Sequence, residues 1–367
     1  MNGHLAVFAV AAVGTFLFAF PVRRLLIRFA VVALPDERRV HARPTPVGGG
    51  AAMFLAFLVA MAVASRLPAF RAVFDGSSEP LGVVLAAAVI FGVGFLDDLR
   101  EVSAPAKAAG QVLAGSVLYL LGVSMFFFRI PFLDFISVSP DFQPLITVLW
   151  VMGMANAVNL IDGLDGLAAG IVAIASGAFF IYALQLTDAG LLPEENMGPL
   201  IAAITLGVCV GFLPHNFHPA RIFMGDAGAL FLGLLMAAST LVVGGRSEQP
   251  FSGQTYFFYA PIFVPFFVMG VPILDTLFSI VRRSRNFAVR DTGHLHYRLM
   301  HLGHGHRRAV VILWAWTAVL SLIVLYPTFT NRGNALVPVG MAALGVSLYT
   351  FFHPGIRRRE APAAPDG

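Results

Sequence analysis

Long apolar blocks are the feature that most constrains how this chain can fold. Each block is about 16–25 residues long, enough for a helix to cross the ~30 Å hydrocarbon core of a bilayer. Hydrophobic residues make up 58% of the chain and charged residues only 12%, whereas a soluble domain carries roughly 25% charged residues. A soluble fold is therefore excluded. The eleven blocks lie at about 5–22, 47–64, 81–96, 108–128, 143–160, 166–186, 198–214, 227–245, 257–281, 309–328 and 334–352.

These blocks predict an all-α integral membrane protein, with residues 1–367 forming a single polytopic domain of about eleven transmembrane helices. Basic residues orient it, because Lys and Arg gather in cytoplasmic loops. With the N-terminus outside, 19 of the 24 basic residues fall in the cytoplasmic segments. We therefore expect an external N-terminus, a cytoplasmic C-terminus, and a location in the inner (plasma) membrane. The cytoplasmic loops 23–46, 97–107, 161–165, 215–226 and 282–308 are expected to form the active face.

Charge and cysteine content narrow the function further. The net charge is +4 and the isoelectric point is about 9.6, but the basic residues follow the membrane topology, so no nucleic-acid partner is expected. Cys209 is the only cysteine, which excludes an intramolecular disulfide and a cysteine metal cage. The first block begins at Leu5 with no basic residue before it, and we interpret it as a retained helix.

Acidic and amide side chains mark the cytoplasmic ends of two blocks. Asp97 and Asp98 end the third block, and two adjacent carboxylates ionise together only at a cost unless a cation is near. A solvated helix end is the alternative. Further on, a polar stripe with a period of three residues continues out of the fifth block, and its members would share one helix face. Such a stripe is expensive in a membrane unless it binds something; the alternative is a capped turn between helices. Its members are Asn156, Asn159, Asp162 and Asp165.

Two later segments carry polar side chains of the same kind. Asp226 opens the eighth block after a stretch that contains Asn216, and this pattern indicates either a metal or phosphate site or a simple helix cap. A histidine-rich loop then includes His294, His296 and Arg298. Imidazoles could bind zinc there, or the loop could donate hydrogen bonds to a diphosphate. A solvated basic loop is the third alternative. The loop's outer histidines, His301, His304 and His306, are expected to be mostly solvated.

Together, these segments resemble the polyprenyl-phosphate N-acetylhexosamine-1-phosphate transferases, the glycosyltransferase 4 family of the WecA and TagO type, which is related to the MraY type. The resemblance runs from about Arg38 to Arg308 in the order and spacing of the family's motifs. It implies an integral membrane enzyme with a cytoplasmic site that moves a sugar 1-phosphate from a UDP-sugar to undecaprenyl phosphate and releases UMP. It also implies a need for Mg²⁺, with Mn²⁺ as the alternative ion.

The resemblance also assigns roles to residues, position by position. By this assignment, Asp226 and Asp97 hold the metal, and Lys107 and Asp98 bind the lipid phosphate. One departure is Tyr297, which stands where many members have a further histidine. The resemblance implies catalytic roles for Asp97, Asp98, Asp162 and Asp165, and nucleotide-sugar contacts for Asn159, Asn216, His294, His296 and Arg298.

The first cytoplasmic loop favours one branch of this family. Its sequence from Ala42 to Gly49, ARPTPVGG, is similar to the amino-sugar branch rather than to the muramoyl-pentapeptide branch. We therefore expect a UDP-N-acetylhexosamine donor, most simply UDP-N-acetylglucosamine, in the first step of an envelope glycan. A muramoyl-pentapeptide phosphotransferase is the alternative enzyme, and a membrane transporter is the alternative from another class. The expected partners are the UDP-sugar donor, undecaprenyl phosphate and the lipid bilayer. A homodimer is the oligomeric state that we consider.

Overall fold

The computed structural model describes residues 2–33, 44–124, 127–129, 135–193, 195–244, 305–330 and 336–352, and it confirms a helical membrane protein. Ten predicted blocks overlap helices, nine of them over most of their length, and the remaining block, 257–281, lies outside the described residues. The helices are α1 (Asn2–Arg28), α2 (Gly50–Ala64), a 3-10 turn (Pro68–Phe70), α3 (Arg71–Gly76), α4 (Glu79–Leu99), α5 (Ala104–Leu120), α6 (Gln143–Ile161), α7 (Leu167–Asp188), α8 (Gly198–Asn216), α9 (Gly225–Gly244), α13 (His306–Thr330) and α14 (Leu336–Phe352).

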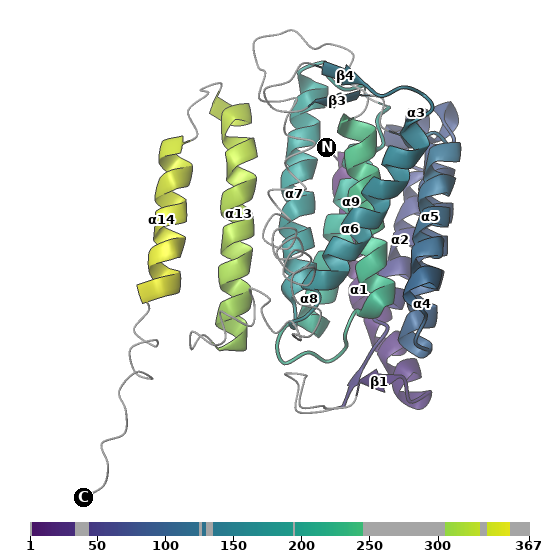
Figure 1. Ribbon diagram of the computed structural model, residues 1–367, viewed down its shortest axis with the longest axis vertical. Helices are drawn as coiled ribbons and strands as arrows, with labels where there is room; N and C mark the ends of the chain where they lie inside the picture. Colours follow the sequence, from purple (N-terminus) through teal and green to yellow (C-terminus); the bar gives the residue numbers. More distant parts are fainter. Residues whose placement is uncertain are drawn as a thin grey trace, which may run out of the picture.

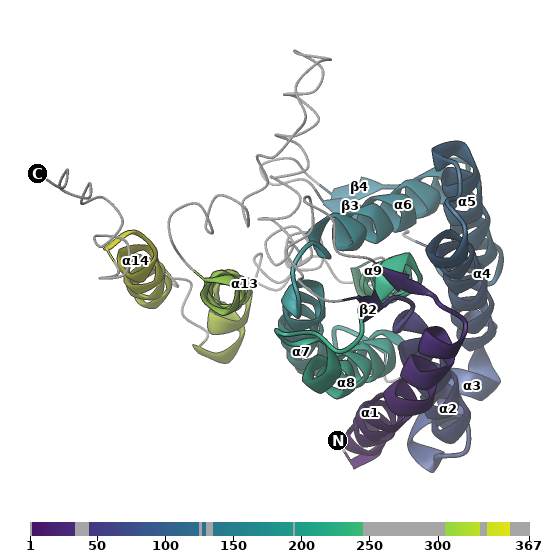
Figure 2. The ribbon, with the colours of Figure 1, turned by 90° about the horizontal axis from the view of Figure 1, so that it is seen from below.

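Helix α9 is the centre of the bundle. It packs against α4, α6, α8, α2 and α7, and the view along the helix axes shows it surrounded by the others (Figure 2). Nearly all of its side chains are buried, including Leu230, Phe231 and Leu234. Helix α13 packs on α7 at the edge of this bundle, and α14 packs on α13 (Figure 1). The eighth apolar block thus forms a helix that is shielded on every side.

Helix α4 packs closely against the first turn of α9. A Cβ atom at Gly94 of α4 would lie 2.6 Å from the carbonyl oxygen of Asp226, so only glycine permits this approach. Small residues at helix contacts let backbones come together in membrane proteins. The end of α4 and the beginning of α9 are therefore held in direct contact.

Six of the described helices are long and apolar enough to cross a membrane. The count rises to seven if α2 and the short helices after it, which bend by 91° at Ser65–Leu67, form one broken span. The number eleven and the outward N-terminus remain predictions. The helices run up and down between two ends, and strand β1 (Val32–Ala33), the α4–α5 link and the α8–α9 link, which all belong to segments predicted to be cytoplasmic, lie at the lower end in Figure 1.

The fourth apolar block differs from its prediction. The sequence predicted a span over 108–128, but α5 begins at Ala104 and ends at Leu120, and two short strands follow it, β3 (Phe127–Arg129) and β4 (Phe135–Ser137), which pair antiparallel. Gly122 ends the helix with a φ of 97°, a left-handed conformation that favours glycine. The Val123 amide donates to the Leu118 carbonyl at 2.9 Å, as in a Schellman cap.

Several loop boundaries also shift, because helices extend past the apolar residues. Helix α1 continues to Arg28, and Lys107 and Asp98 lie inside helices rather than in a loop over 97–107. Pro105, in the first turn of α5, is at a position where proline favours helix initiation. Side chains that were predicted to lie in a loop, such as Asp98 and Lys107, are therefore part of the helix ends.

The first loop is joined to the start of α9. Strands β1 (Val32–Ala33) and β2 (Thr45–Pro46) pair antiparallel. Beyond β2, the Phe223 amide donates to the Pro46 carbonyl at 2.9 Å, and the Gly49 amide donates to the Phe223 carbonyl at 2.8 Å. This backbone pairing fixes the entry to α2 against the segment that leads into α9.

Candidate active site

A cavity of about 960 Å³ opens at the lower end of the bundle. It is bounded by the links that follow α1, α4, α6 and α8 and by the first residue of α13, which are far apart in sequence. Its volume falls in the range of small-molecule and cofactor sites, roughly 300–1,000 Å³. The polar lining residues are Asp97, Asp98, Arg100, Glu101, Asn159, Asp162, Asp165, Asn216, Asp226 and His306.

Lys107 joins two of the acids at this cavity. Its Nζ atom lies 2.7 Å from Oδ2 of Asp97 and also pairs with Oδ2 of Asp226. Asn159 donates from Nδ2 to the same Asp226 oxygen at 3.0 Å. Side chains from α4, α5 and α6 therefore converge on the first turn of α9, and the structure brings together the predicted residues Asp97, Lys107, Asn159 and Asp226.

Asp98 has a different environment from its neighbour Asp97. One of its carboxylate oxygens accepts from the Asp226 amide at 2.8 Å, and the other accepts from the Ala227 amide at 3.2 Å. Gly225 precedes them with a φ of 70°, and a side chain there would strike the Asp98 carboxylate. Asp98 thus caps the N-terminus of α9 from another helix, where a negative charge is favourable.

Asp97 is held by a backbone donor as well as by Lys107. Its Oδ1 atom accepts from the Val102 amide at 2.8 Å, which fixes the carboxylate at the turn between α4 and α5. The Asp97 side chain keeps 17% of its surface exposed, so this carboxylate can be reached from the cavity.

Asp162 lies in the link between α6 and α7, where it lines the cavity. Burial raises the pKa of its carboxyl group to about 8, and the nearby carboxylates of Asp226, Asp98 and Asp165 raise it further. Closely spaced carboxylates resist ionisation unless a cation is near. The cavity is therefore an environment in which added positive charge is stabilised.

Asn216 and Asp165 join two links at the cavity wall. The buried amide of Asn216 accepts from the Gly166 amide at 3.0 Å and donates to the Ile222 carbonyl at 3.1 Å. Asp165 accepts from the Ala220 amide at 3.1 Å and pairs with Nδ1 of His218 at 2.6 Å. Both predicted residues line the cavity, and both also hold the α8–α9 link against the α6–α7 link.

One expectation about the histidine loop is wrong. His306 is not mostly solvated: it is half-buried, lines the cavity and stacks on the His218 ring with a centroid distance of 4.1 Å. The reason is that α13 begins at His306, three residues before the predicted start of the tenth block, and packs against α7. His294, His296 and Arg298 lie outside the described residues, as do His301 and His304.

Sequence reasoning did not assign roles to two residues near this site. Gln111 of α5 exchanges hydrogen bonds with Asn156 of α6 at 3.2 and 2.9 Å. His218 precedes Asp226 by eight residues, and its contact with Asp165 spans 53 residues. The signal that was available for Gln111 was an amide four residues after Lys107 inside an apolar helix.

The structure therefore defines a polytopic membrane protein with an acidic cavity at one end of its helices. Comparison with known proteins identifies its family. The model of glycosyl transferase family 4 matches residues 80–244. The chain is 38% identical over 370 residues to the decaprenyl-phosphate N-acetylglucosaminephosphotransferase of Mycobacterium tuberculosis, an alignment that covers 97% of this chain and 90% of the relative.

Two further relatives differ from each other in the sugar that their names specify. The chain is 35% identical over 305 residues to a probable undecaprenyl-phosphate N-acetylglucosaminyl 1-phosphate transferase of Bacillus subtilis, covering 82% of this chain and 78% of the relative. It is 34% identical over 314 residues to the phospho-N-acetylmuramoyl-pentapeptide-transferase of Desulforudis audaxviator, covering 78% of this chain and 85% of the relative. The chain belongs to glycosyl transferase family 4, which confirms the family expected from its motifs.

Proposed function

We propose that this protein transfers N-acetylglucosamine 1-phosphate from UDP-N-acetylglucosamine to a polyprenyl phosphate and releases UMP. The convergence of Asp97, Lys107 and Asn159 on Asp226, at the wall of a cavity of about 960 Å³, is the observation that carries this proposal. The names of the two relatives that transfer N-acetylglucosamine phosphate to decaprenyl and undecaprenyl phosphate support it. Family membership leaves the transporter alternative without support.

The reaction brings two anions together, because a phosphate monoester attacks a diphosphate. Their charge must be neutralised before an in-line displacement can occur. Lys107 supplies one fixed positive charge, and Asn159 orients the carboxylate of Asp226 beside it. The side chains of this cluster therefore neutralise the charge of the substrates and position them, and they do not themselves form the new bond.

The donor set at the cavity fits Mg²⁺, which prefers hard oxygen ligands. We assign Asp226 and Asp97 as the residues that would hold it, because their carboxylates face one another across Lys107 and reach the cavity. Mn²⁺ would suit the same oxygens. When bound, the ion would neutralise the diphosphate and stabilise the leaving UMP.

Asp97 is a better candidate than Asp98 for contact with the attacking phosphate. Asp98 already accepts from two backbone amides of α9, whereas Asp97 is partly exposed to the cavity. The second pKa of a phosphate monoester is near 6, so most of the acceptor is ionised at pH 7 and a base would contribute little. Asp97 therefore acts mainly by orienting the acceptor, and a covalent aspartyl-phosphate route would use the same residue as a nucleophile.

A donor and acceptor panel tests the proposal. The protein is purified into nanodiscs and given UDP-N-acetylglucosamine, UDP-N-acetylgalactosamine or UDP-N-acetylmuramoyl-pentapeptide, with decaprenyl or undecaprenyl phosphate as acceptor. UMP release and the mass of the lipid product are measured with and without Mg²⁺. We expect a GlcNAc-pyrophosphoryl-polyprenol that requires the divalent ion. Product from the muramoyl donor alone would assign the chain to the other branch and refute the proposal.

We also propose that the cavity faces the cytoplasm of a plasma-membrane protein, as the basic residues predict. Because Cys209 is buried, single-cysteine labelling has little background. Ser103 lies in the α4–α5 link, at the end of α4 that carries Asp97, and Ser77 lies in the α3–α4 link at the other end of α4; both are exposed. In intact cells, an impermeant maleimide should label Ser77→Cys and spare Ser103→Cys until the membrane is opened. The reverse pattern would invert the topology.

A further inference from the structure

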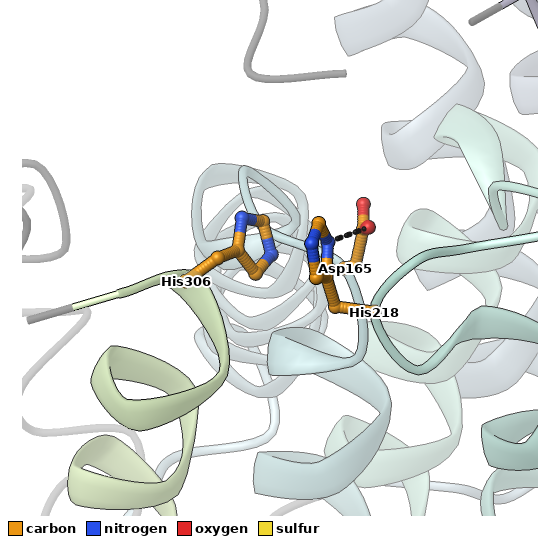
Figure 3. Close-up of side chains that lie close together, drawn as sticks. All are labelled: Asp165, His218 and His306. Atoms are coloured by element: carbon orange, nitrogen blue, oxygen red, sulfur yellow. Dashed lines mark hydrogen bonds and ion pairs between the residues drawn. The ribbon is translucent and has the colours of Figure 1, made fainter. Parts of the chain in front are cut away.

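A carboxylate and two imidazoles meet beside the cavity from three separate parts of the chain. Asp165 lies in the α6–α7 link, His218 in the α8–α9 link, and His306 is the first residue of α13. Figure 3 shows the three side chains side by side, with Asp165 bonded to His218. One potential ligand atom from each residue lies within 4.8 Å of those from the other two.

The spacing of these atoms fits a small tetrahedral ion. Around Zn²⁺, with nitrogen and oxygen ligands at about 2.1 Å, ligand atoms lie about 3.4 Å apart. The contact of 2.6 Å between Asp165 and His218 and the limit of 4.8 Å for the whole group bracket that value. Small rotations of the side chains would therefore bring all three to one ion.

The three residues are half-buried, and some of their ligand atoms are screened from solvent. Both ring nitrogens of His306 are buried, and the described residues offer them only a poorly aligned contact with the Asp165 main chain. A buried polar atom without a good hydrogen bond destabilises the folded state. The Asp165 side chain is only 10% exposed, and a cation would satisfy its carboxylate and an imidazole of His306 together.

The surrounding contacts hold the three segments in place. Arg307 donates from Nε to the His218 carbonyl at 2.9 Å. About two turns further along α13, the ring of Trp314 lies against Phe217, with a centroid distance of 5.7 Å. The start of α13 is therefore already positioned beside the α8–α9 link, so a metal would join preformed elements.

We propose that Asp165, His218 and His306 form a second metal site, which binds Zn²⁺ and fastens the start of α13 to the two links at the cavity. Imidazole ligands suit zinc and related transition metals, whereas Mg²⁺ selects oxygen. Coordination through Nδ1 of His218 requires any proton on that nitrogen to leave to solvent. Asp165 and His306 line the same cavity as Asp97 and Asp226, but none of the three ligands belongs to the Asp97–Lys107–Asp226 cluster, and zinc binding can be measured without the transfer reaction.

Metal content tests the proposal without any substrate. The full chain, purified through a tag that contains no histidine, is placed in nanodiscs and dialysed against zinc-free buffer with excess Mg²⁺. Mass spectrometry of the metals should find about one zinc per chain. His306→Ala and His218→Ala should each bind zinc about 10–100-fold more weakly, since a ligand is lost.

A matched histidine and a spectroscopic readout complete the experiment. His4 provides the control. It packs on Phe70 and Phe180 at the beginning of α1, whereas the cavity lies at the end of this helix. The His4→Ala variant should therefore bind as much zinc as the unaltered protein. The unaltered protein, loaded with Co²⁺, should show the visible absorption band of a tetrahedral site even if the variants misfold. If the unaltered protein retains no zinc and shows no such band, the group is a hydrogen-bonded Asp–His pair only and the proposal is overturned. Equal zinc loss in His4→Ala would overturn it as well.

Discussion

The amide pair between α5 and α6 gives the sharpest prediction about how the site is supported. Gln111 is 2% exposed and exchanges two hydrogen bonds with Asn156, which also donates to the Met152 carbonyl at 2.7 Å. Lys107 lies one helical turn before Gln111, and Asn159 lies three residues after Asn156. Because both contact Asp226, the amide pair sets the spacing of two helices that reach the same carboxylate.

Replacing one amide should destabilise the fold by a measurable amount. Polar contacts between membrane helices contribute about 0.6 kcal/mol on average and at most about 1.7 kcal/mol. Two reciprocal hydrogen bonds place this pair toward the upper end, so we expect a coupling energy of about 1–1.5 kcal/mol between Gln111→Leu and Asn156→Leu. The double variant should therefore be less destabilised than the sum of the single variants.

The measurement is reversible unfolding in mixed micelles, followed by tryptophan fluorescence, for the single and double variants. Ser116→Ala is the matched control, because its hydroxyl bonds only to the Val112 carbonyl within α5; its effect should add to that of Asn156→Leu. Turnover per folded molecule should fall in Gln111→Leu and return in the exchange variant Gln111→Asn/Asn156→Gln. Additive single effects, with coupling below about 0.3 kcal/mol, would refute the reasoning.

Four further outcomes are expected. Asp226→Asn should lower turnover at least about 100-fold without changing membrane insertion, and near-normal activity at limiting Mg²⁺ would exclude the metal assignment. Lys107→Ala should reduce kcat/KM for polyprenyl phosphate about 10–100-fold, more than for the UDP-sugar; equal effects on both would contradict its placement. Asp98→Asn should lower stability by about 0.5–2 kcal/mol, as for a lost helix cap, and lost turnover at unchanged Tm would instead make it catalytic. His294→Ala and His296→Ala should each cost about 10–100-fold in kcat/KM for the UDP-sugar, measured by initial rates.

Apolar length is what made the helices predictable from sequence. A block as long as 143–160 is expected to be helical because a helix satisfies its backbone hydrogen bonds within the segment and needs about this length to cross the lipid, and α6 spans Gln143–Ile161. The same reasoning placed the end of α5 too late. The aromatic residues before Arg129 are as apolar as those of a membrane helix, so the hydropathy of the sequence does not show that the helix ends before Gly122. The left-handed conformation of Gly122 sets the end of α5, and the hydropathy of the sequence gives no sign of it.

The site was predictable in its residue types but not in its contacts. Acids and amides near helix ends pointed to the cavity, since they are costly there without a ligand. That Asp98 would cap α9 could not be derived, because its partner amides are 128 and 129 residues away. The same holds for His218 and His306, which meet only because α13 packs beside the α8–α9 link.

The central position of α9 has a consequence for how this protein loses activity. Its first turn carries Asp226, and the rest of the helix is enclosed by its neighbours. A site on a peripheral loop can melt while the scaffold persists, but here the acid belongs to the most deeply buried of the described membrane-length helices. Heat inactivation and loss of helical signal should therefore occur together, at one temperature. Screening detergents by thermal stability alone would then select for active protein.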